Sequence, residues 1–195
     1  MNVSHLVKWI WWAPARCATR SVHNVMKYYE FEDLSGNMHP TYPGKSDGYT
    51  HNIGIPIGYE DYKIVILIRN PYSRMVSTWN LEAFIDKSKD STPKISFDIF
   101  ARNKKFIDFD TAKKTKAPDY FIRYENLQDD IINLPFLDKT DTNIQEIISQ
   151  NISTNNYSSS SDDYKKYYTE ELANIVYNIN KKEFEAFSYD KNSWK

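Results

Sequence analysis

Ile64-Val-Ile-Leu-Ile-Arg-Asn-Pro-Tyr-Ser-Arg-Met-Val-Ser-Thr-Trp79 is the most informative stretch of the chain. Its five apolar residues, Ile64–Ile68, end at a polar turn, which is typical of a buried parallel strand. Pro71 lies just inside the expected start of a helix, where the missing N–H of proline has no intrahelical partner to lose. The carboxyl end of a strand therefore meets a helix N-terminus, the place where ligands bind in open α/β sheets.

The junction between this strand and this helix carries the side chains that an anion site requires. Free N–H groups and the helix dipole favour an anion at a helix start. Arg69 adds a planar, permanently charged guanidinium that suits phosphate. Ser77 follows eight residues later, about two helical turns on and near the same face, so its hydroxyl could reach the same anion. An ordinary strand, turn and helix with a surface arginine is the alternative.

Residues 69–77, Arg-Asn-Pro-Tyr-Ser-Arg-Met-Val-Ser, resemble the 3′-phosphate-binding motif of sulfotransferases that use PAPS (3′-phosphoadenosine 5′-phosphosulfate). The variant with Tyr72-Ser73-Arg74 is most similar to the carbohydrate (Golgi-type) branch of that family. The resemblance implies that Arg69 and Ser77 hold the 3′-phosphate of PAPS.

Length and composition limit the classes of protein to consider. A chain of 195 residues suits one domain with a substantial core. Its net charge of −1 provides no global field to recruit nucleic acid or an anionic membrane. No apolar run is long enough to span a bilayer, and the N-terminal stretch is unlike a signal peptide. The single Cys17 cannot form an internal disulfide, which agrees with a reducing compartment. Together these features lead us to expect a cytoplasmic protein without nucleic-acid or membrane partners.

Apolar periodicity and turn residues predict the remaining elements. Thr19 is expected to cap the first helix, and Thr169 to begin the last. Alternating strands and helices indicate an α/β fold, which we expect to be a single P-loop-like domain over residues 1–195. Its mostly parallel central sheet would be flanked by helices on both faces. The predicted strands cover residues 6–12, 64–68 and 120–123, and the predicted helices residues 19–29, 71–85, 96–102, 143–148 and 169–187.

Residues 14–21, Pro-Ala-Arg-Cys-Ala-Thr-Arg-Ser, join the first predicted strand to the first predicted helix. This is the position of a P-loop, in which backbone N–H groups and a helix start cradle phosphate oxygens. The Gly-Lys-Ser/Thr of nucleoside triphosphatases is absent, so ATP or GTP hydrolysis is not expected. A cysteine-phosphatase loop would place an arginine where this chain has His23, which argues against a catalytic Cys17.

The same loop resembles the 5′-phosphosulfate loop of PAPS-dependent sulfotransferases. Arg16 falls where the family places a basic residue that contacts the bridging oxygen and the sulfate. Ala18 falls at the usual glycine, and Thr19 at a hydroxyl that holds the 5′-phosphate. The loop departs from the family in Ala15, which separates the proline from the basic residue, and in Ser21, which replaces an adenine-stacking tryptophan. The nucleotide contacts implied here are Arg16, Cys17, Ala18, Thr19, Arg20 and Ser21.

Sulfuryl transfer needs a base for the acceptor hydroxyl and cations for the leaving phosphate. His51 follows Thr50, as the catalytic histidine follows a threonine in cytosolic sulfotransferases, and the resemblance implies that it acts as the base beside Arg16. A histidine suits this task because its unperturbed pKa lies near neutrality. Golgi-type relatives often use a glutamate instead, so the alternatives are His39, Glu60 and Glu82.

Two further segments resemble the family. Residues 121–127, Phe-Ile-Arg-Tyr-Glu-Asn-Leu, are similar to its Arg-Tyr-Glu-Asp-Leu segment, which implies that Tyr124 approaches the adenine. The segment before Tyr167-Tyr168 is similar to a loop that folds over the cofactor, where Ser158 could supply a hydroxyl.

The resemblance as a whole implies a sulfotransferase that uses PAPS, releases PAP (adenosine 3′,5′-bisphosphate) and needs no metal. The acceptor would be a hydroxyl compound, a carbohydrate by branch resemblance or otherwise a small alcohol or phenol. Two alternatives stay open: a catalytically silent nucleotide-binding protein on the same fold, and a P-loop small-molecule kinase.

Overall fold

A computed structural model of the chain describes residues 2–14, 16–33, 58–82, 95–106, 117–153 and 164–195. The backbone contacts divide the chain into two compact units. Each unit has its own core of buried apolar side chains. No helix within the described ranges is both long enough and apolar enough to cross a membrane. The first unit is Met1–Ile68 with Asp110–Asn156, and the second is Arg69–Phe109 with Tyr157–Lys195.

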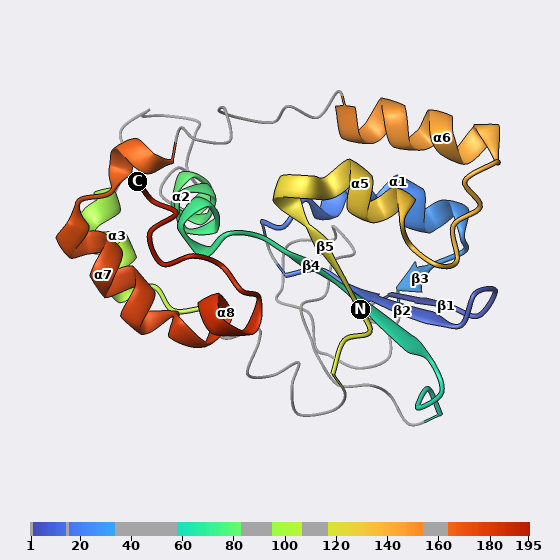
Figure 1. Cartoon of the computed structure of the whole chain (residues 1–195), viewed down its shortest axis with the longest axis horizontal. Helices are drawn as coiled ribbons and strands as arrows, with labels where there is room; N and C mark the ends of the chain where they lie inside the picture. Colours follow the sequence, from blue (N-terminus) through green and yellow to red (C-terminus); the bar gives the residue numbers. More distant parts are fainter. Residues whose placement is uncertain (1, 15, 34–57, 83–94, 107–116, 154–163) are drawn as a thin grey trace. The chain divides into compact units, whose positions relative to one another are not determined.

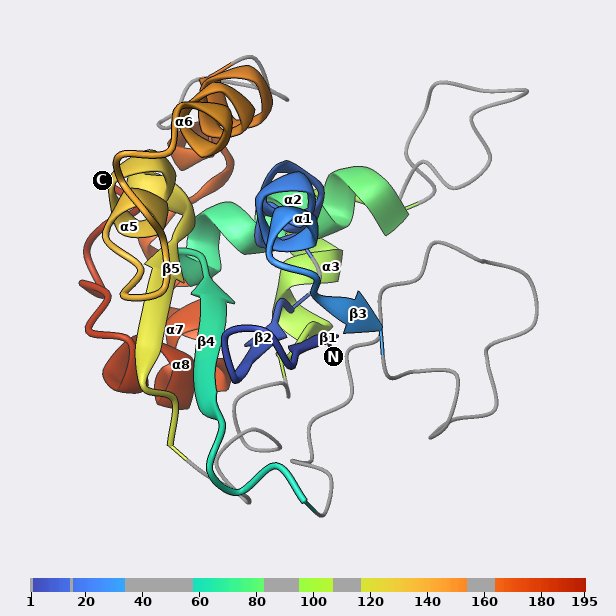
Figure 2. The same cartoon turned by 90° about the vertical axis from the view of Figure 1, so that its right-hand side faces the viewer.

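The first unit contains a five-stranded mixed sheet (Figure 2). Strands β2, β4 and β5 are parallel, whereas β1 is antiparallel to both β2 and β3. The α/β class is therefore confirmed, but the expected mostly parallel sheet is mixed, because β1 and β2 form a hairpin. The strand order is β3 (Glu32–Asp33), β1 (Asn2–Ser4), β2 (Trp9–Trp12), β4 (Lys63–Ile68) and β5 (Tyr120–Arg123).

The N-terminal hairpin corrects the strand predicted at residues 6–12. Leu6 is 62% exposed and lies in the turn between the two strands, so β2 begins only at Trp9. Ser4 at the end of β1 is buried, and its hydroxyl donates to the carbonyl oxygen of Tyr29 at 2.5 Å. A three-residue strand such as β1 is too short for its apolar alternation to be recognised in the sequence.

The helices described in the first unit lie along one side of the sheet (Figure 1). They are α1 (Thr19–Tyr28), α5 (Leu127–Ile132) and α6 (Thr142–Ile148), with a 3₁₀ turn η2 (Tyr124–Asn126) before α5 and a π-helical turn η3 (Ser149–Ser153) after α6. The predictions for α1 and α6 are confirmed, and α5 was missed. The core of this unit includes Trp9, Trp11, Val22, Val25, Met26, Val65, Leu67, Ile122, Ile131 and Ile144.

Strand β5 has the predicted bounds, but most of its residues are not buried. Only Ile122 of its four residues is buried, and Tyr120 is 37% exposed. Among the described strands β5 pairs with β4 only and lies at one edge of the sheet. An edge strand has a neighbour on one side only, so more of its surface is open to solvent than that of a central strand.

The described part of the second unit is helical (Figure 1), and its core is rich in aromatic side chains. Its elements are α2 (Pro71–Glu82), α3 (Phe97–Asn103), a short 3₁₀ turn η4 (Lys165–Tyr167), α7 (Glu170–Ile179) and α8 (Lys181–Ala186). The predicted starts of α2 and α7 are confirmed. The core includes Tyr72, Met75, Trp79, Phe97, Phe100, Tyr168, Leu172, Val176 and Phe184.

The single helix predicted at residues 169–187 is wrong, because Asn180 divides it into α7 and α8. Asn180 leaves the helical conformation, with φ −110° and ψ 20°. Its side-chain amide donates to the carbonyl of Val176 at 3.0 Å, and its amide oxygen accepts the N–H of Phe106 at 2.8 Å. Asparagine can replace helical hydrogen bonds in this way, and apolar periodicity does not reveal it.

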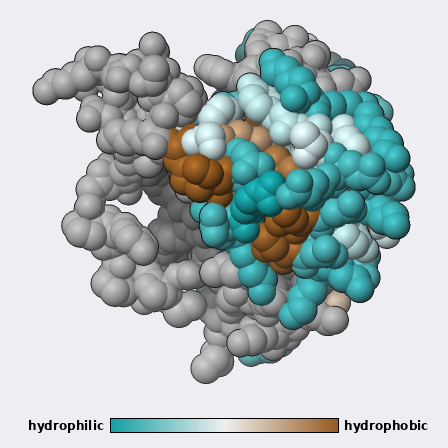
Figure 3. Space-filling view, turned by 90° about the vertical axis from the view of Figure 1, so that its left-hand side faces the viewer, coloured by the Kyte–Doolittle hydropathy of each residue, from teal (hydrophilic) through white to brown (hydrophobic). Residues whose placement is uncertain are grey.

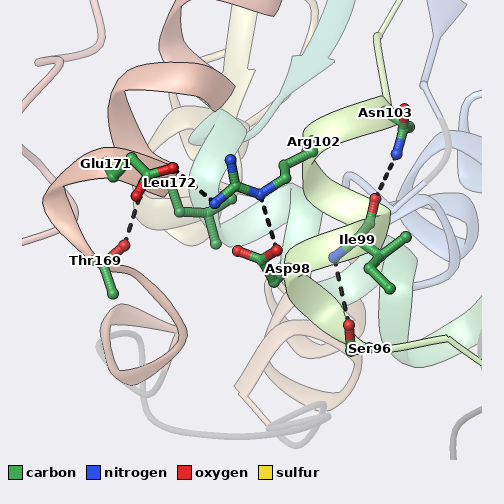
Figure 4. A network of polar contacts seen from close by, with 8 residues as sticks. All are labelled: Ser96, Asp98, Ile99, Arg102, Asn103, Thr169, Glu171 and Leu172. Atoms are coloured by element: carbon green, nitrogen blue, oxygen red, sulfur yellow. Dashed lines mark hydrogen bonds and ion pairs between the residues drawn. The ribbon is translucent and has the colours of Figure 1, made fainter.

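The surface of the second unit joins α3 to α7 through Arg102 (Figure 4). Arg102 Nε donates to Asp98 at 2.8 Å, and a terminal nitrogen donates to Glu171 at 2.9 Å. These groups are exposed, so we assign the network little weight in stability. The face drawn in Figure 3 shows a few apolar residues among hydrophilic ones. Its exposed large apolar residues are Leu81, Ile95 and Ile99.

A buried ion pair links α2 to α8 within the second unit. Arg74 and Glu183 lie 3.4 Å apart, and their side chains are 6% and 5% exposed. The Arg74 guanidinium also lies 4.1 Å from the centre of the Phe106 ring. Removing either partner of a buried ion pair is destabilising, because the remaining charge is not hydrated by bulk water.

The Glu183→Gln variant is expected to lose about 2–3 kcal/mol of unfolding free energy, because the buried Arg74 cation loses the negative charge of Glu183. Urea denaturation followed by circular dichroism measures the loss. Glu185→Gln is the matched control, since Glu185 on the same helix forms an exposed pair with Lys181 at 3.5 Å. The control should change stability by less than about 0.5 kcal/mol. Equal losses in the two variants would contradict a special role for the buried pair.

Candidate functional site

The loop after β2 is held in a strained backbone conformation. Arg16 and Ala18 have φ values of 67° and 63°, in the left-handed region that glycine usually occupies. Each such residue costs roughly 1–2 kcal/mol and persists only where the surrounding structure fixes it. Left-handed residues in such loops direct successive backbone N–H groups toward one point and create an anion-binding concavity. The strain is therefore located where the sequence predicts phosphate binding.

Cys17 anchors this loop to the core of the first unit. Its side chain is 1% exposed and packs in the same core as Trp11 and Val22. Its N–H donates to the carbonyl of Pro14 at 3.3 Å. Because the thiol is buried among apolar side chains, it is suited to packing and not to nucleophilic attack. Any contact of Cys17 with a bound phosphate would have to come from its backbone.

Helix α1 begins without a side-chain cap from the described residues. Ala18 in the left-handed conformation is the N-cap, so Thr19 is the first helical residue and not the cap predicted for it. The first turn also contains no acidic residue. By contrast, Asp141 caps α6 and Thr169 caps α7 with their side-chain oxygens. The start of α1 therefore keeps the orphan N–H groups and the positive dipole end that favour an anion.

The predicted 5′-phosphosulfate residues lie together at this loop and helix start. Arg16 is exposed, and Thr19 and Ser21 are half-buried in the first turn of α1, with Arg20 between them in the chain. The carboxyl ends of the parallel strands β2, β4 and β5 lie at the same end of the sheet. Tyr124 follows β5 at this end and is half-buried. In the sheet, β4 lies between β5 and β2, the strand that the loop follows.

Arg69 and Ser77 lie in the second unit, at the start and along the length of α2. The Nε of Arg69 donates to the hydroxyl of Ser73 at 2.6 Å. Ser73 and Ser77 are four residues apart and lie along one face of α2, and Arg69, which precedes the helix, reaches this face through its bond to Ser73. Ser73 is 6% exposed, Ser77 is 8% exposed, and Arg69 is half-buried. We call this face, formed by Ser73, Ser77 and the adjoining Arg69, the polar face of α2; it combines a cation with two hydroxyls. The sequence analysis missed Ser73, although the interval of four was its signal.

Asn70 caps α2, which changes how an anion would be held there. Its amide oxygen accepts the N–H of Tyr72 at 2.9 Å, and its amide nitrogen donates to Ser193 at 2.9 Å. Pro71 has no N–H, so the first turn of α2 offers fewer backbone donors than the sequence suggested. An anion at this terminus would therefore depend on side chains, above all on Arg69.

Buried hydrogen bonds hold α2 in place within its unit. The Tyr72 hydroxyl lies 2.8 Å from the carbonyl oxygen of Lys191 and 3.2 Å from that of Ala173, and its single hydrogen can bond either one. The Tyr168 hydroxyl donates to the carbonyl of Tyr72 at 2.9 Å. Tyr72 of the motif thus holds α2 in place, as does Arg74 through its ion pair with Glu183. The face of α2 that Arg69 contacts therefore belongs to a fixed element.

Glu60 is the candidate base whose side chain the structure describes. The other candidates, His39, His51 and the side chain of Glu82, lie outside the described residues, as does the predicted cofactor contact Ser158. Glu60 is exposed, and both of its carboxylate oxygens lie 3.0 Å from the backbone nitrogen of Gly58. This hydrogen bond holds the pKa of Glu60 below its usual value. A carboxylate with a lowered pKa is a weaker proton acceptor, so Glu60 is poorly suited to act as the base.

In the part of the chain that the structure describes, no group of three or more His, Cys, Asp and Glu side chains could hold a metal ion. No family model matches the sequence, and no curated protein or solved structure matches it. The chemistry of the strained loop and of the polar face of α2 is therefore what bears on function.

Proposed function

We propose that the protein is a PAPS-dependent sulfotransferase that transfers a sulfuryl group to an acceptor hydroxyl. In this proposal β2, the loop at Arg16–Ser21 and α1 are a P-loop-like cradle for the 5′-phosphosulfate. Arg69 and Ser77 bind the 3′-phosphate, and Tyr124 contacts the adenine. His51 is the base. The acceptor is a carbohydrate hydroxyl, or a small alcohol or phenol, and the single buried Cys17 fits a cytoplasmic location.

The observation that carries the proposal is the strained loop at the uncapped start of α1. Two non-glycine residues with left-handed backbone, Arg16 and Ala18, lie in a loop that Cys17 ties to the core. Strain of this kind is kept where a site needs a particular backbone. The loop lacks the lysine and glycine of a triphosphate cradle, which favours a smaller anionic group over ATP.

The polar face of α2 supports PAPS as the specific nucleotide. A 3′-phosphate is the group that distinguishes PAPS and PAP from ATP and ADP. Arg69 supplies a permanent positive charge, and Ser77 supplies a hydroxyl on the face of α2 that Arg69 contacts through Ser73. Charge-assisted hydrogen bonds from arginine to phosphate are among the strongest that a protein surface makes.

The proposed reaction is an in-line displacement at sulfur. The acceptor oxygen forms a bond to the sulfur of PAPS while the bond from that sulfur to the bridging phosphate oxygen breaks. The acceptor proton passes to His51, and PAP leaves with the electron pair of the broken bond. Arg16 balances the charge that develops on the leaving phosphate.

Isothermal titration with PAP and with ADP tests the nucleotide assignment. We expect PAP to bind at least about tenfold more tightly, because one charged hydrogen-bonded phosphate contact is worth more than 1.4 kcal/mol. Tighter binding of ADP would instead support a small-molecule kinase. If PAP binds but labelled PAPS transfers no sulfate to any sugar, alcohol or phenol tried, the protein is a silent nucleotide-binding protein.

A further inference from the structure

We infer that Ser73 is a positioning residue for 3′-phosphate recognition, which it serves by orienting the guanidinium of Arg69. The inference rests on the proposed function and adds to it a residue that does not itself bind the nucleotide.

The contact between the two side chains is short and well placed. Arg69 Nε lies 2.6 Å from Ser73 Oγ, and Ser73 is 6% exposed. A hydrogen bond to Nε constrains the plane of the guanidinium, because the nitrogen belongs to the same rigid planar group as the two terminal nitrogens. The serine hydroxyl thereby limits the directions in which those terminal nitrogens can point.

Another buried hydroxyl on α2, that of Thr78, behaves as helical hydroxyls commonly do. Thr78 Oγ1 donates to the carbonyl of Arg74, four residues earlier, at 2.8 Å. Ser73 has the same exposure of 6%, but its oxygen accepts from a cationic side chain. Thr78 is therefore a matched control for Ser73, because its hydroxyl bonds the helix backbone whereas that of Ser73 bonds Arg69.

Orientation of the guanidinium should matter because arginine loses rotamer freedom when it binds a phosphate. A side chain that is already fixed loses less of this freedom on binding, and the ligand binds more tightly as a result. The effect should apply only to the group that Arg69 recognises. Ser73 is therefore expected to influence the 3′-phosphate and to leave the rest of the nucleotide unaffected.

The test compares PAP with adenosine 5′-monophosphate, which lacks the 3′-phosphate, by isothermal titration. Ser73→Ala is expected to raise the dissociation constant of PAP about tenfold and to leave that of adenosine 5′-monophosphate unchanged. Ser73→Cys should behave alike, because sulfur is a weak acceptor in a side chain of similar size. Thr78→Val should leave both constants unchanged. Thermal unfolding checks that each variant is folded.

A double-mutant cycle separates positioning from an independent contact. Adding Ser73→Ala to Arg69→Ala should weaken PAP binding no further, since the serine acts through the arginine. If the two effects multiply, or if Ser73→Ala and Ser73→Cys keep the wild-type preference for PAP, the inference is overturned while the proposed function stands. If wild-type protein does not prefer PAP to adenosine 5′-monophosphate, the proposed function fails and the inference fails with it.

Discussion

Arg69→Ala is expected to weaken the binding of PAP by about 2–5 kcal/mol, or roughly 30- to 5,000-fold. The guanidinium is half-buried, and its Nε is held by Ser73, so its charge sits in a fixed place on the α2 face. Asn70 and Pro71 leave few backbone donors at this helix start, and the hydroxyl of Ser77 alone cannot balance a doubly charged phosphate. Isothermal titration with PAP measures the loss directly.

Two control variants make this result specific. Arg102→Ala removes another arginine of the second unit, one that bonds Asp98 and Glu171 in the network of Figure 4, and should leave PAP affinity unchanged. Arg69→Lys keeps the charge but loses the planar fork, so its affinity should fall between wild type and Arg69→Ala. Affinity of Arg69→Ala equal to that of wild type would remove the 3′-phosphate assignment.

The parts of the fold that could be predicted are those with a strong local pattern. The apolar run of β4 ends at Ile68, and Pro71 begins α2, as expected from the preference of proline for a first helical turn. Thr169 caps α7 with its hydroxyl, which accepts the N–H of Leu172 at 3.2 Å. In each case a single residue type has a strong preference that neighbouring residues do not oppose.

The errors arose where tertiary contacts decide the conformation. Asn180 ends α7 because its side chain bonds Phe106, a residue 74 positions away in the sequence. Ala18 takes a left-handed conformation that its own side chain disfavours, and this moves the cap away from Thr19. The hairpin partner of β2 was missed because three residues carry too little pattern. Local preference cannot anticipate the end of α7, since it depends on a contact from a distant part of the chain.

The predicted roles of the candidate site residues stay predictions, but the structure shows how some of these residues are held. Helical spacing indicates that Ser73 and Ser77 share a face of α2, whereas the contact of Arg69 with this face comes from its bond to Ser73. The buried side chain of Cys17 packs in the core and anchors the loop, so a phosphate contact predicted for Cys17 would have to come from its backbone. The role of Ser73 depends on a rotamer of Arg69 that spacing alone does not determine.

His51→Ala is expected to lower turnover by roughly 10²–10⁴-fold while PAP affinity stays unchanged. A general base acts on the acceptor hydroxyl and not on the nucleotide, so its loss should affect the chemical step alone. Steady-state rates with labelled PAPS give the turnover, and titration with PAP gives the affinity. A loss of both together would indicate that His51 supports the nucleotide site and is not the base.

The pH dependence of the rate separates a histidine base from a glutamate base. A base must be deprotonated to act, so activity falls as the pH drops through its pKa. An ordinary histidine gives this fall near pH 6.5, whereas an ordinary glutamate gives it near pH 4.3. If Glu60 were the base, activity would persist to a still lower pH, because the Gly58 N–H holds the pKa of that carboxyl down. Loss of turnover in Glu82→Gln or His39→Ala, with His51→Ala fully active, would move the base to that residue and leave the nucleotide assignment intact.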